Sequence, residues 1–152
     1  MRLKNRFMQF VINFSDNEKS NREKVLTASV ILDSIRQSVA INFGDLVLGK
    51  VFRSMKIRHY SPLTFSFIMK TSREYYREVW AAVTTITQIR GKPVQIVCLN
   101  VSGNLKKCGI FATTWTQNFF KDIKRIDTTE ANQYSQQSIE EELHSLKTLH
   151  VR

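Results

Sequence analysis

The stretch VFRSMKIRHYSPLTFSFIMKT, residues 51–71, decides the fold because it predicts two strands joined by a tight turn. Residues 51–60 are rich in β-branched and aromatic side chains, which favours a strand. Ser61 and Pro62 supply turn residues, and residues 63–71 repeat the strand composition. We therefore expect an antiparallel hairpin over this stretch.

Strand and helix patterns flank the hairpin on both sides. The expected elements are strands at 6–14 and 94–101 and helices at 26–43, 71–89 and 104–126. Gly44 is expected to end the first helix, because glycine accepts the left-handed conformation. Thr71 and Glu74 have the spacing of a capping box at the start of the second helix. Gly91 and Pro93 would close that helix, and the apolar run 94–101 predicts a strand buried on both faces.

The order strand, helix, strand, strand, helix, strand, helix predicts an α+β fold of the ferredoxin-like class. In this βαββαβ sandwich a four-stranded antiparallel sheet packs against its crossover helices, and additional C-terminal helices follow here. A chain of 152 residues suits one folded domain. We expect residues 1–126 to form one ferredoxin-like domain and residues 127–152 a polar tail with one short helix.

The charge of the chain is large and unevenly distributed. The formal net charge is +10 at pH 7. Residues 1–125 carry 21 Lys or Arg against 8 Asp or Glu, whereas residues 126–152 carry 2 against 5. Clustered cations bind nucleic acid by releasing its condensed counterions. This distribution favours a polyanionic partner for the basic part of the chain.

Signatures of enzymes, cofactor sites and membrane spans are missing from the sequence. It contains no P-loop, GxGxxG, GxSxG or HExxH motif. Cys98 and Cys108 form no CxxC pair, so we expect reduced thiols, no metal site and an intracellular protein. No run approaches 18 apolar residues, so no membrane span is expected. Phe65 and Phe67 lack the glycine-led pattern of the usual RNA-recognition motif and are interpreted as core residues.

Two separated basic segments are natural places to hold a phosphate. Arg2, Lys4 and Arg6 project to one side if the N-terminus is extended. Ser102 and Gly103 open a helix whose first turn carries Lys106 and Lys107, although the helix dipole disfavours cations there. A solvated terminus and an ordinary polar helix start are the alternatives. With the first and last strands antiparallel at opposite edges of the sheet, both segments would lie toward one end and could form a shared phosphate-binding edge.

A resemblance to a known family rests on short segments in one order along residues 1–126. The segments are RLKNRF (2–7), NFGD (42–45), SRE (72–74), VWAA (79–82) and VSGNLKK (101–107). They resemble the small ferredoxin-like protein subunit of ribonuclease P and RNase MRP of archaea and eukaryotes. Phe7 departs from the pattern, because the family often has tyrosine there.

The resemblance implies an accessory subunit without catalytic residues, metal or cofactor. In that family the RNA performs 5′-leader cleavage of precursor tRNA, and the small protein binds and stabilises the RNA. The implied partners are RNase P RNA, RNase MRP RNA, a TIM-barrel-like subunit, a related ferredoxin-like small subunit and a large scaffold subunit. The implied location is the nucleus and nucleolus. By motif match the RNA-binding residues are Arg2, Lys4, Arg6, Arg73, Ser102, Gly103, Lys106 and Lys107.

Other readings of the sequence stay open. The chain could be another basic RNA-binding protein, such as a ribosomal one, or a small ferredoxin-like enzyme or ligand-binding regulator. A convergent pocket of titratable groups would favour the enzyme. Arg73 could also have a structural role, since it lies at an expected helix start. The sequence leaves open which of the two ribonucleoproteins the chain serves.

Overall fold

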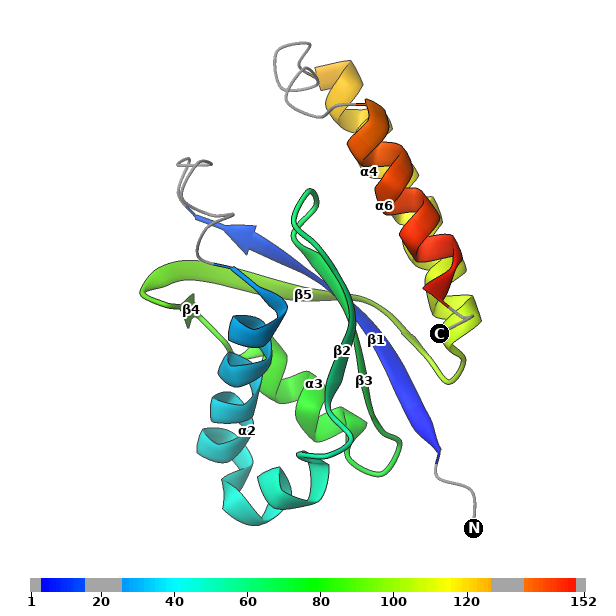
Figure 1. The fold of residues 1–152 in the computed structure, drawn as a ribbon. Helices are drawn as coiled ribbons and strands as arrows, with labels where there is room; N and C mark the ends of the chain where they lie inside the picture. The colour runs from blue at the N-terminus through cyan, green and yellow to red at the C-terminus, as the bar shows by residue number, and fades with distance from the viewer. Residues whose placement is uncertain (1–3, 16–25, 127–135, 150–152) are drawn as a thin grey trace.

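The structure, a computed structural model, describes residues 4–15, 26–126 and 136–149 (Figure 1). These residues form an α+β fold with a five-stranded antiparallel sheet and four helices. The elements are β1 (Asn5–Phe14), α2 (Ala28–Val51), β2 (Lys56–Ser61), β3 (Ser66–Ser72), α3 (Tyr76–Thr84), β4 (Gln88–Ile89), β5 (Lys92–Ser102), α4 (Leu105–Ile126) and α6 (Gln136–Lys147). No helix in the described ranges is long and apolar enough to cross a membrane.

The sheet has the strand order β2-β3-β1-β5-β4. Its four long strands follow the order of the expected βαββαβ arrangement, but the expected strand count of four is wrong. The additional strand is β4, which is two residues long and pairs with the start of β5. Arg90 and Gly91 join the two strands with φ angles of 48° and 76°. Glycine adopts such angles without penalty, so this short hairpin can form where the sequence predicted only a helix end.

The first strand lies inside the sheet, between β3 and β5. The expectation that the first and last strands lie at opposite edges is therefore wrong. Each of the two crossovers connects parallel strands that are separated by one other strand. β3 lies between β1 and β2, and β1 lies between β3 and β5. As a result β1 pairs directly with β5, and Phe7 lies opposite Ser102.

The first helix continues beyond its expected end. Gly44 does break the helical conformation, with φ 85° and ψ 169°, but a second helical segment then runs to Val51. Val51 is fully buried in the core, which fixes this segment. The strand expected from residue 51 therefore begins only at Lys56.

The second helix is shorter than expected at both ends. Thr71 pairs with Arg6 in the ladder between β1 and β3, so it belongs to a strand and cannot begin a helix. The predicted capping box of Thr71 and Glu74 is wrong: Tyr75 occupies the cap position, without a side-chain hydrogen bond. The helix ends at Thr84, because the residues that follow lead into β4.

Helices cover both faces of the sheet (Figure 1). Under α2 and α3 lies the main core, in which Phe10 and Phe67 stack with ring centroids 5.3 Å apart. Under α4 and α6 lies a smaller cluster, made of Ile68, Cys108, Ala112, Leu146 and Leu149. Val97 is 38% exposed, so β5 is not buried on both faces as expected.

The helix α6 is fixed to the sheet as well as to α4. Nε2 of His59 on β2 lies 2.7 Å from Oε1 of Glu142, and both side chains are about nine-tenths buried. Against α4, a Cβ at Gly109 would lie 3.3 Å from the main-chain oxygen of Leu146, so a larger residue would push the two helices apart by a few tenths of an ångström. Of the expected polar tail, residues 127–135 and 150–152 lie outside the described residues.

We expect Cys108 to resist alkylation in the folded protein. Burial raises the pKa of its thiol to about 12, and the thiolate is the reactive form. At pH 8 its alkylation should be about a thousandfold slower than that of a free thiol. The measurement uses the Cys98→Ser variant, so that only Cys108 reports. Fast modification without denaturant would contradict the buried position.

Candidate nucleic-acid interface

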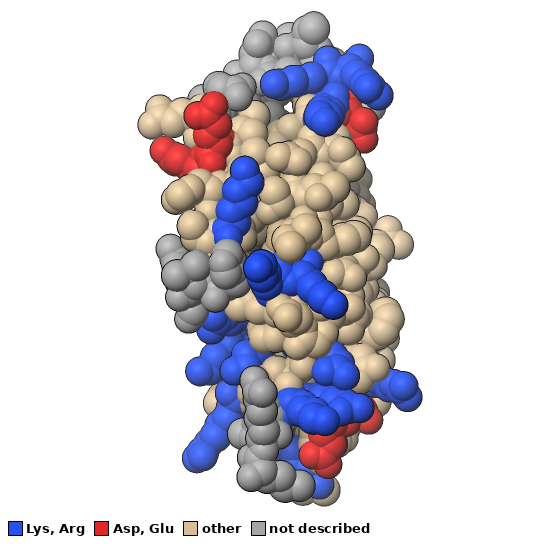
Figure 2. Space-filling view, turned by 90° about the vertical axis from the view of Figure 1, so that its right-hand side faces the viewer, with Lys and Arg blue, Asp and Glu red and all other residues tan. Residues whose placement is uncertain are grey.

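Lys and Arg side chains gather at the end of the molecule where β1 begins (Figure 2). Most of the residues predicted to bind RNA lie there or near it. Lys4, Arg73, Gly103, Lys106 and Lys107 are exposed, Arg6 and Ser102 are half-buried, and Arg2 lies outside the described residues. Because β1 and β5 are direct neighbours, the two basic segments come closer together than the sequence predicted.

Arg6 and Gly103 are in contact. A Cβ built on Gly103 would lie 3.0 Å from Nη1 of Arg6, so the guanidinium rests against this glycine. The same Nη1 donates a hydrogen bond to the main-chain oxygen of Asn5, at 3.1 Å. Any larger residue at position 103 would have to displace the guanidinium. The N-terminal strand and the turn after β5 thus form one basic junction.

Arg73 joins this junction through its main chain. Its N–H donates to the carbonyl oxygen of Lys4, at 2.9 Å, directly beyond the pair formed by Asn5 and Ser72. The backbone of Arg73 therefore continues the ladder, while its exposed side chain remains available to solvent. The sequence left a structural role and a surface role as alternatives for Arg73. In the structure the main chain of Arg73 has the structural role, and its side chain is at the surface.

Asn104, which the site prediction omitted, caps α4. Its Oδ1 accepts the N–H of Lys106 at 2.8 Å, and its own N–H donates to Oγ of Ser102 at 3.2 Å. This is ordinary N-cap chemistry. The helix begins at Leu105, two residues after the glycine expected to open it. An anion at this end would meet the exposed side chains of Lys106 and Lys107, because the cap occupies the Lys106 amide.

Tyr76 lies close to two guanidinium groups. Cζ of Arg6 and Cζ of Arg77 each lie 5.8 Å from the centroid of its ring. Nε of Arg77 donates to the phenolic oxygen at 3.4 Å, and this bond and the charge of Arg77 lower the pKa of Tyr76. Burial works against that shift, and the charges of Arg6 and Arg73 add to it. Tyr76 lies within the range 71–89 that was expected to be a helix, and the sequence of that range gave no sign of these neighbours.

A basic pocket adjoins the junction, and the sequence did not predict it. It has a volume of about 380 Å³, and its cations are Lys4, Lys50, Arg53 and Lys70. Glu74 is its one acidic lining residue among those described. Lys70 on β3 is also directly paired with Lys56 on the adjacent strand β2. Two like charges facing each other in this way repel and destabilise the sheet unless an anion lies near them. Lys50 lies at the end of α2, Arg53 in the turn after it, Lys70 on β3 and Lys4 just before β1. No single sequence motif therefore brings these cations together.

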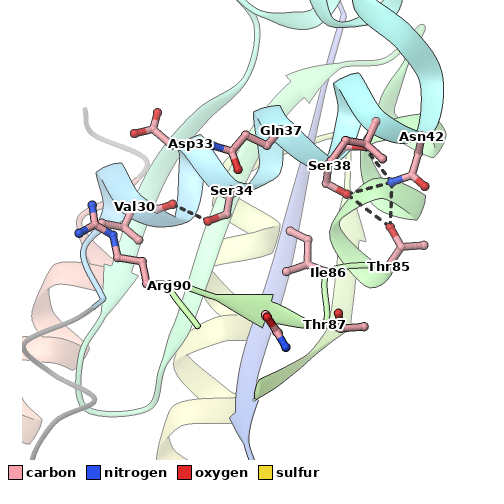
Figure 3. Close-up of a pocket in the computed structure, with 12 residues that line it drawn as sticks. Val30, Asp33, Ser34, Gln37, Ser38, Asn42, Thr85, Ile86, Thr87 and Arg90 are labelled. Carbon is pink, nitrogen blue, oxygen red and sulfur yellow. Dashed lines mark hydrogen bonds between the residues drawn. The ribbon is translucent and has the colours of Figure 1, made fainter. Parts of the chain in front are cut away.

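The pocket between α2 and the loop after α3 has a different character (Figure 3). It is about 580 Å³ in volume, and the side chains of Ser38, Asn42 and Thr85 in its lining hydrogen-bond to one another. Oγ of Ser38 donates to the oxygen of Ala82 at 2.6 Å, and Nδ2 of Asn42 donates to the oxygen of Ser38 at 2.8 Å. Within the described ranges, no group of three His, Cys, Asp or Glu could hold a metal ion.

Comparison with known proteins gives a family match over most of the chain. The model of the Rpp14/Pop5 family matches residues 6–113. This range includes Arg6 and Gly103 and ends within α4.

Curated relatives and a solved structure agree with that match. The ribonuclease P/MRP protein subunit POP5 of Schizosaccharomyces pombe is 33% identical over 133 residues, covering 84% of this chain and 96% of the relative. A probable ribonuclease P/MRP protein subunit POP5 of Arabidopsis thaliana is 32% identical, covering 69% and 72%. A chain of the cryo-EM structure of yeast ribonuclease MRP has a TM-score of 0.56 and 10% identity, covering 83% of this chain and 98% of that one. This last similarity concerns the fold alone.

Proposed function

The chain belongs to the Rpp14/Pop5 family, and we propose that it serves as a non-catalytic protein subunit of ribonuclease P and of RNase MRP. Its relatives in fission yeast and Arabidopsis are described as subunits of these ribonucleoproteins. In this proposal the RNA performs the cleavage of precursor tRNA, and the protein binds and stabilises that RNA. We assign the core to the ferredoxin-like class, with β4 as an added strand.

The contact between Arg6 and Gly103 carries the RNA-binding proposal. A glycine lets a phosphate approach the main chain closely, and an arginine beside it supplies charge and directed hydrogen bonds. Lys106 and Lys107 stand exposed just beyond this glycine, and Lys4 stands exposed at the start of β1. Contacts of this kind neutralise phosphates and fix the position of a nucleic acid without reading its sequence.

The proposed partners include other protein subunits: a TIM-barrel-like one, a related ferredoxin-like one and a large scaffold. Apolar side chains exposed on α2 and α4 support protein contacts of this kind, since large exposed apolar groups mark interaction surfaces. Ile41 is 83% exposed and Leu46 74% on α2, and Ile110 is 59% exposed on α4. The proposed location is the nucleus and nucleolus.

Purification of the tagged full chain from its own cells, followed by sequencing of the bound RNA, tests the proposed function. We expect RNase P RNA, RNase MRP RNA or both. Recovery of ribosomal RNA alone would overturn the proposal in favour of a ribosomal or general RNA-binding protein. The same purification identifies the protein subunits that accompany the chain.

Replacing Lys106 and Lys107 with alanine is expected to weaken RNA binding and its salt dependence together. Each lost phosphate contact lowers the slope of log affinity against log salt by about 0.7–0.9. Both side chains are exposed, so the free energy of unfolding should change by no more than about 0.5 kcal/mol. Filter binding across a salt series and thermal unfolding measure the two quantities. An unchanged slope would leave these lysines as solvated surface residues.

A further inference from the structure

A groove runs between α3 and β5, beside the basic junction. It is lined by Arg6, Tyr76, Trp80 and residues 98–103, and it has a volume of about 570 Å³. We call it the Trp80 groove. None of its lining residues is acidic. The groove adjoins the surface that the proposed function assigns to RNA, since both contain Arg6 and Gly103. The proposed function gives no role to the aromatic wall of the groove.

The aromatic wall consists of two side chains on one face of α3. Tyr76 and Trp80 are four residues apart, which places them one helical turn apart on the same side. Val79 and Val83 of the same helix are fully buried in the core. Trp80 is 37% exposed, so part of its indole surface remains accessible beside the groove.

The opposite wall is the outer edge of β5. Among the described residues only β1 pairs with β5 between Gln95 and Ser102, because β4 reaches only Pro93. The edge is also bulged. Gln9 pairs with Asn100 and Phe10 pairs with Cys98, which leaves Leu99 as an extra residue. Bulges of this kind bend a strand and commonly lie beside functional sites, and an open edge offers main-chain hydrogen-bonding groups.

We propose that the Trp80 groove holds an unpaired nucleotide of the bound RNA. The base stacks on the indole of Trp80, beside Tyr76, and its phosphate meets Arg6 and the main chain at Gly103. The proposal rests on the RNA-binding function proposed above and identifies the feature of the RNA that this end of the protein recognises. Aromatic faces combined with a cationic groove are the chemistry that binds single-stranded nucleic acid.

Arg6 favours a nucleotide over a peptide in this groove. A peptide added to the edge of β5 would use main-chain hydrogen bonds and would not need a guanidinium placed against Gly103. A nucleotide uses the main chain, the aromatic wall and the cation at once. Arg6 and Arg77 flank Tyr76 at equal distance, which keeps positive charge along this wall.

Tryptophan fluorescence of the full chain tests the proposal. The chain contains two tryptophans, so the Trp115→Phe variant leaves Trp80 as the sole reporter. The probes are a short oligouridylate and an abasic strand of the same length. We expect the oligouridylate to quench Trp80, and the abasic strand to quench it little, because stacking requires the base.

Affinity measurements on Trp80→Ala complete the test. We expect binding of the oligouridylate to weaken by about 5- to 100-fold, the range for loss of one base stack. The salt slope should stay unchanged, because no phosphate contact is removed, and binding of the abasic strand should change little. Phe111→Ala serves as the matched control, since Phe111 is an aromatic residue 39% exposed on α4. Should Trp80→Ala fold poorly, Trp80→Phe is expected to retain most of the affinity.

Several results would overturn the proposal. They are absent quenching, equal affinity of wild type and Trp80→Ala, and an equal loss on both strands. If Lys106→Ala/Lys107→Ala weakens binding while Trp80→Ala does not, the RNA-binding function stands and the stacking site fails. If Trp80→Ala loses co-purifying protein subunits but keeps its affinity for the oligouridylate, the groove docks a protein segment instead. If the wild-type chain binds neither strand, both the function and the site are contradicted.

Discussion

Replacing Phe10 with alanine should destabilise the protein by about 3–5 kcal/mol, the usual cost of truncating a buried phenylalanine to alanine. Phe10 is fully buried on β1, and its ring stacks on that of Phe67 with 26° between the planes. A domain is stable by only about 5–15 kcal/mol, so the loss is a large share of the total. Chemical denaturation measures the change directly, and the melting temperature should fall by roughly 6–20 °C.

The same substitution at Phe43 provides the control. Phe43 lies on α2, just before Gly44, and is 37% exposed, so its truncation should cost less than about 1 kcal/mol. A double-mutant cycle of Phe10→Ala with Phe67→Ala should show a coupling of about 0.5–1.5 kcal/mol for the aromatic pair. Equal effects at Phe10 and Phe43 would contradict the central position of β1.

The spacing of apolar residues along the sequence correctly predicted those helices and strands whose ends are set by local sequence. The alternating run at β1 and the helical stripe of α4 lie close to their expected positions. Thr71 shows where this reasoning fails, because the capping-box spacing is a local signal. The register with Arg6 is a long-range contact, and it keeps Thr71 in a strand. Similarly, burial of Val51 extends α2 into a segment whose composition favours a strand.

The candidate site was predictable only in part, for the same reason. Arg6 and Gly103 belong to motifs visible in the sequence, but their contact depends on the pairing of β1 with β5. Lys50 and Lys70 lie far apart in the sequence and meet at one pocket. The sequence around Trp80 is typical of a core residue, since Trp80 belongs to an apolar helical stripe. The groove beside it becomes visible only when the residues that surround Trp80 in the fold are known.

Neutralising the basic junction should reduce RNA affinity by about a thousandfold at 0.1 M salt. The variant combines Lys4→Gln, Arg6→Gln, Lys106→Gln and Lys107→Gln. Four lost phosphate contacts lower the salt slope by about three, and each unit of slope is worth tenfold between 0.1 M and 1 M salt. The difference from wild type should therefore vanish near 1 M salt. Arg6 packs against Gly103 and Tyr76, so thermal unfolding must show that the variant remains folded.

A matched variant separates local contacts from general charge attraction. It replaces four exposed cations outside the junction with glutamine, namely Arg90, Lys121, Lys124 and Arg125. Both variants lose the same net charge, so long-range steering of RNA toward the protein falls by a similar amount. Only the junction variant loses cations placed beside Gly103. Equal losses of affinity in the two variants would mean that the RNA is held by overall charge, whereas a loss confined to the junction variant localises the phosphate contacts to the meeting point of β1 and β5.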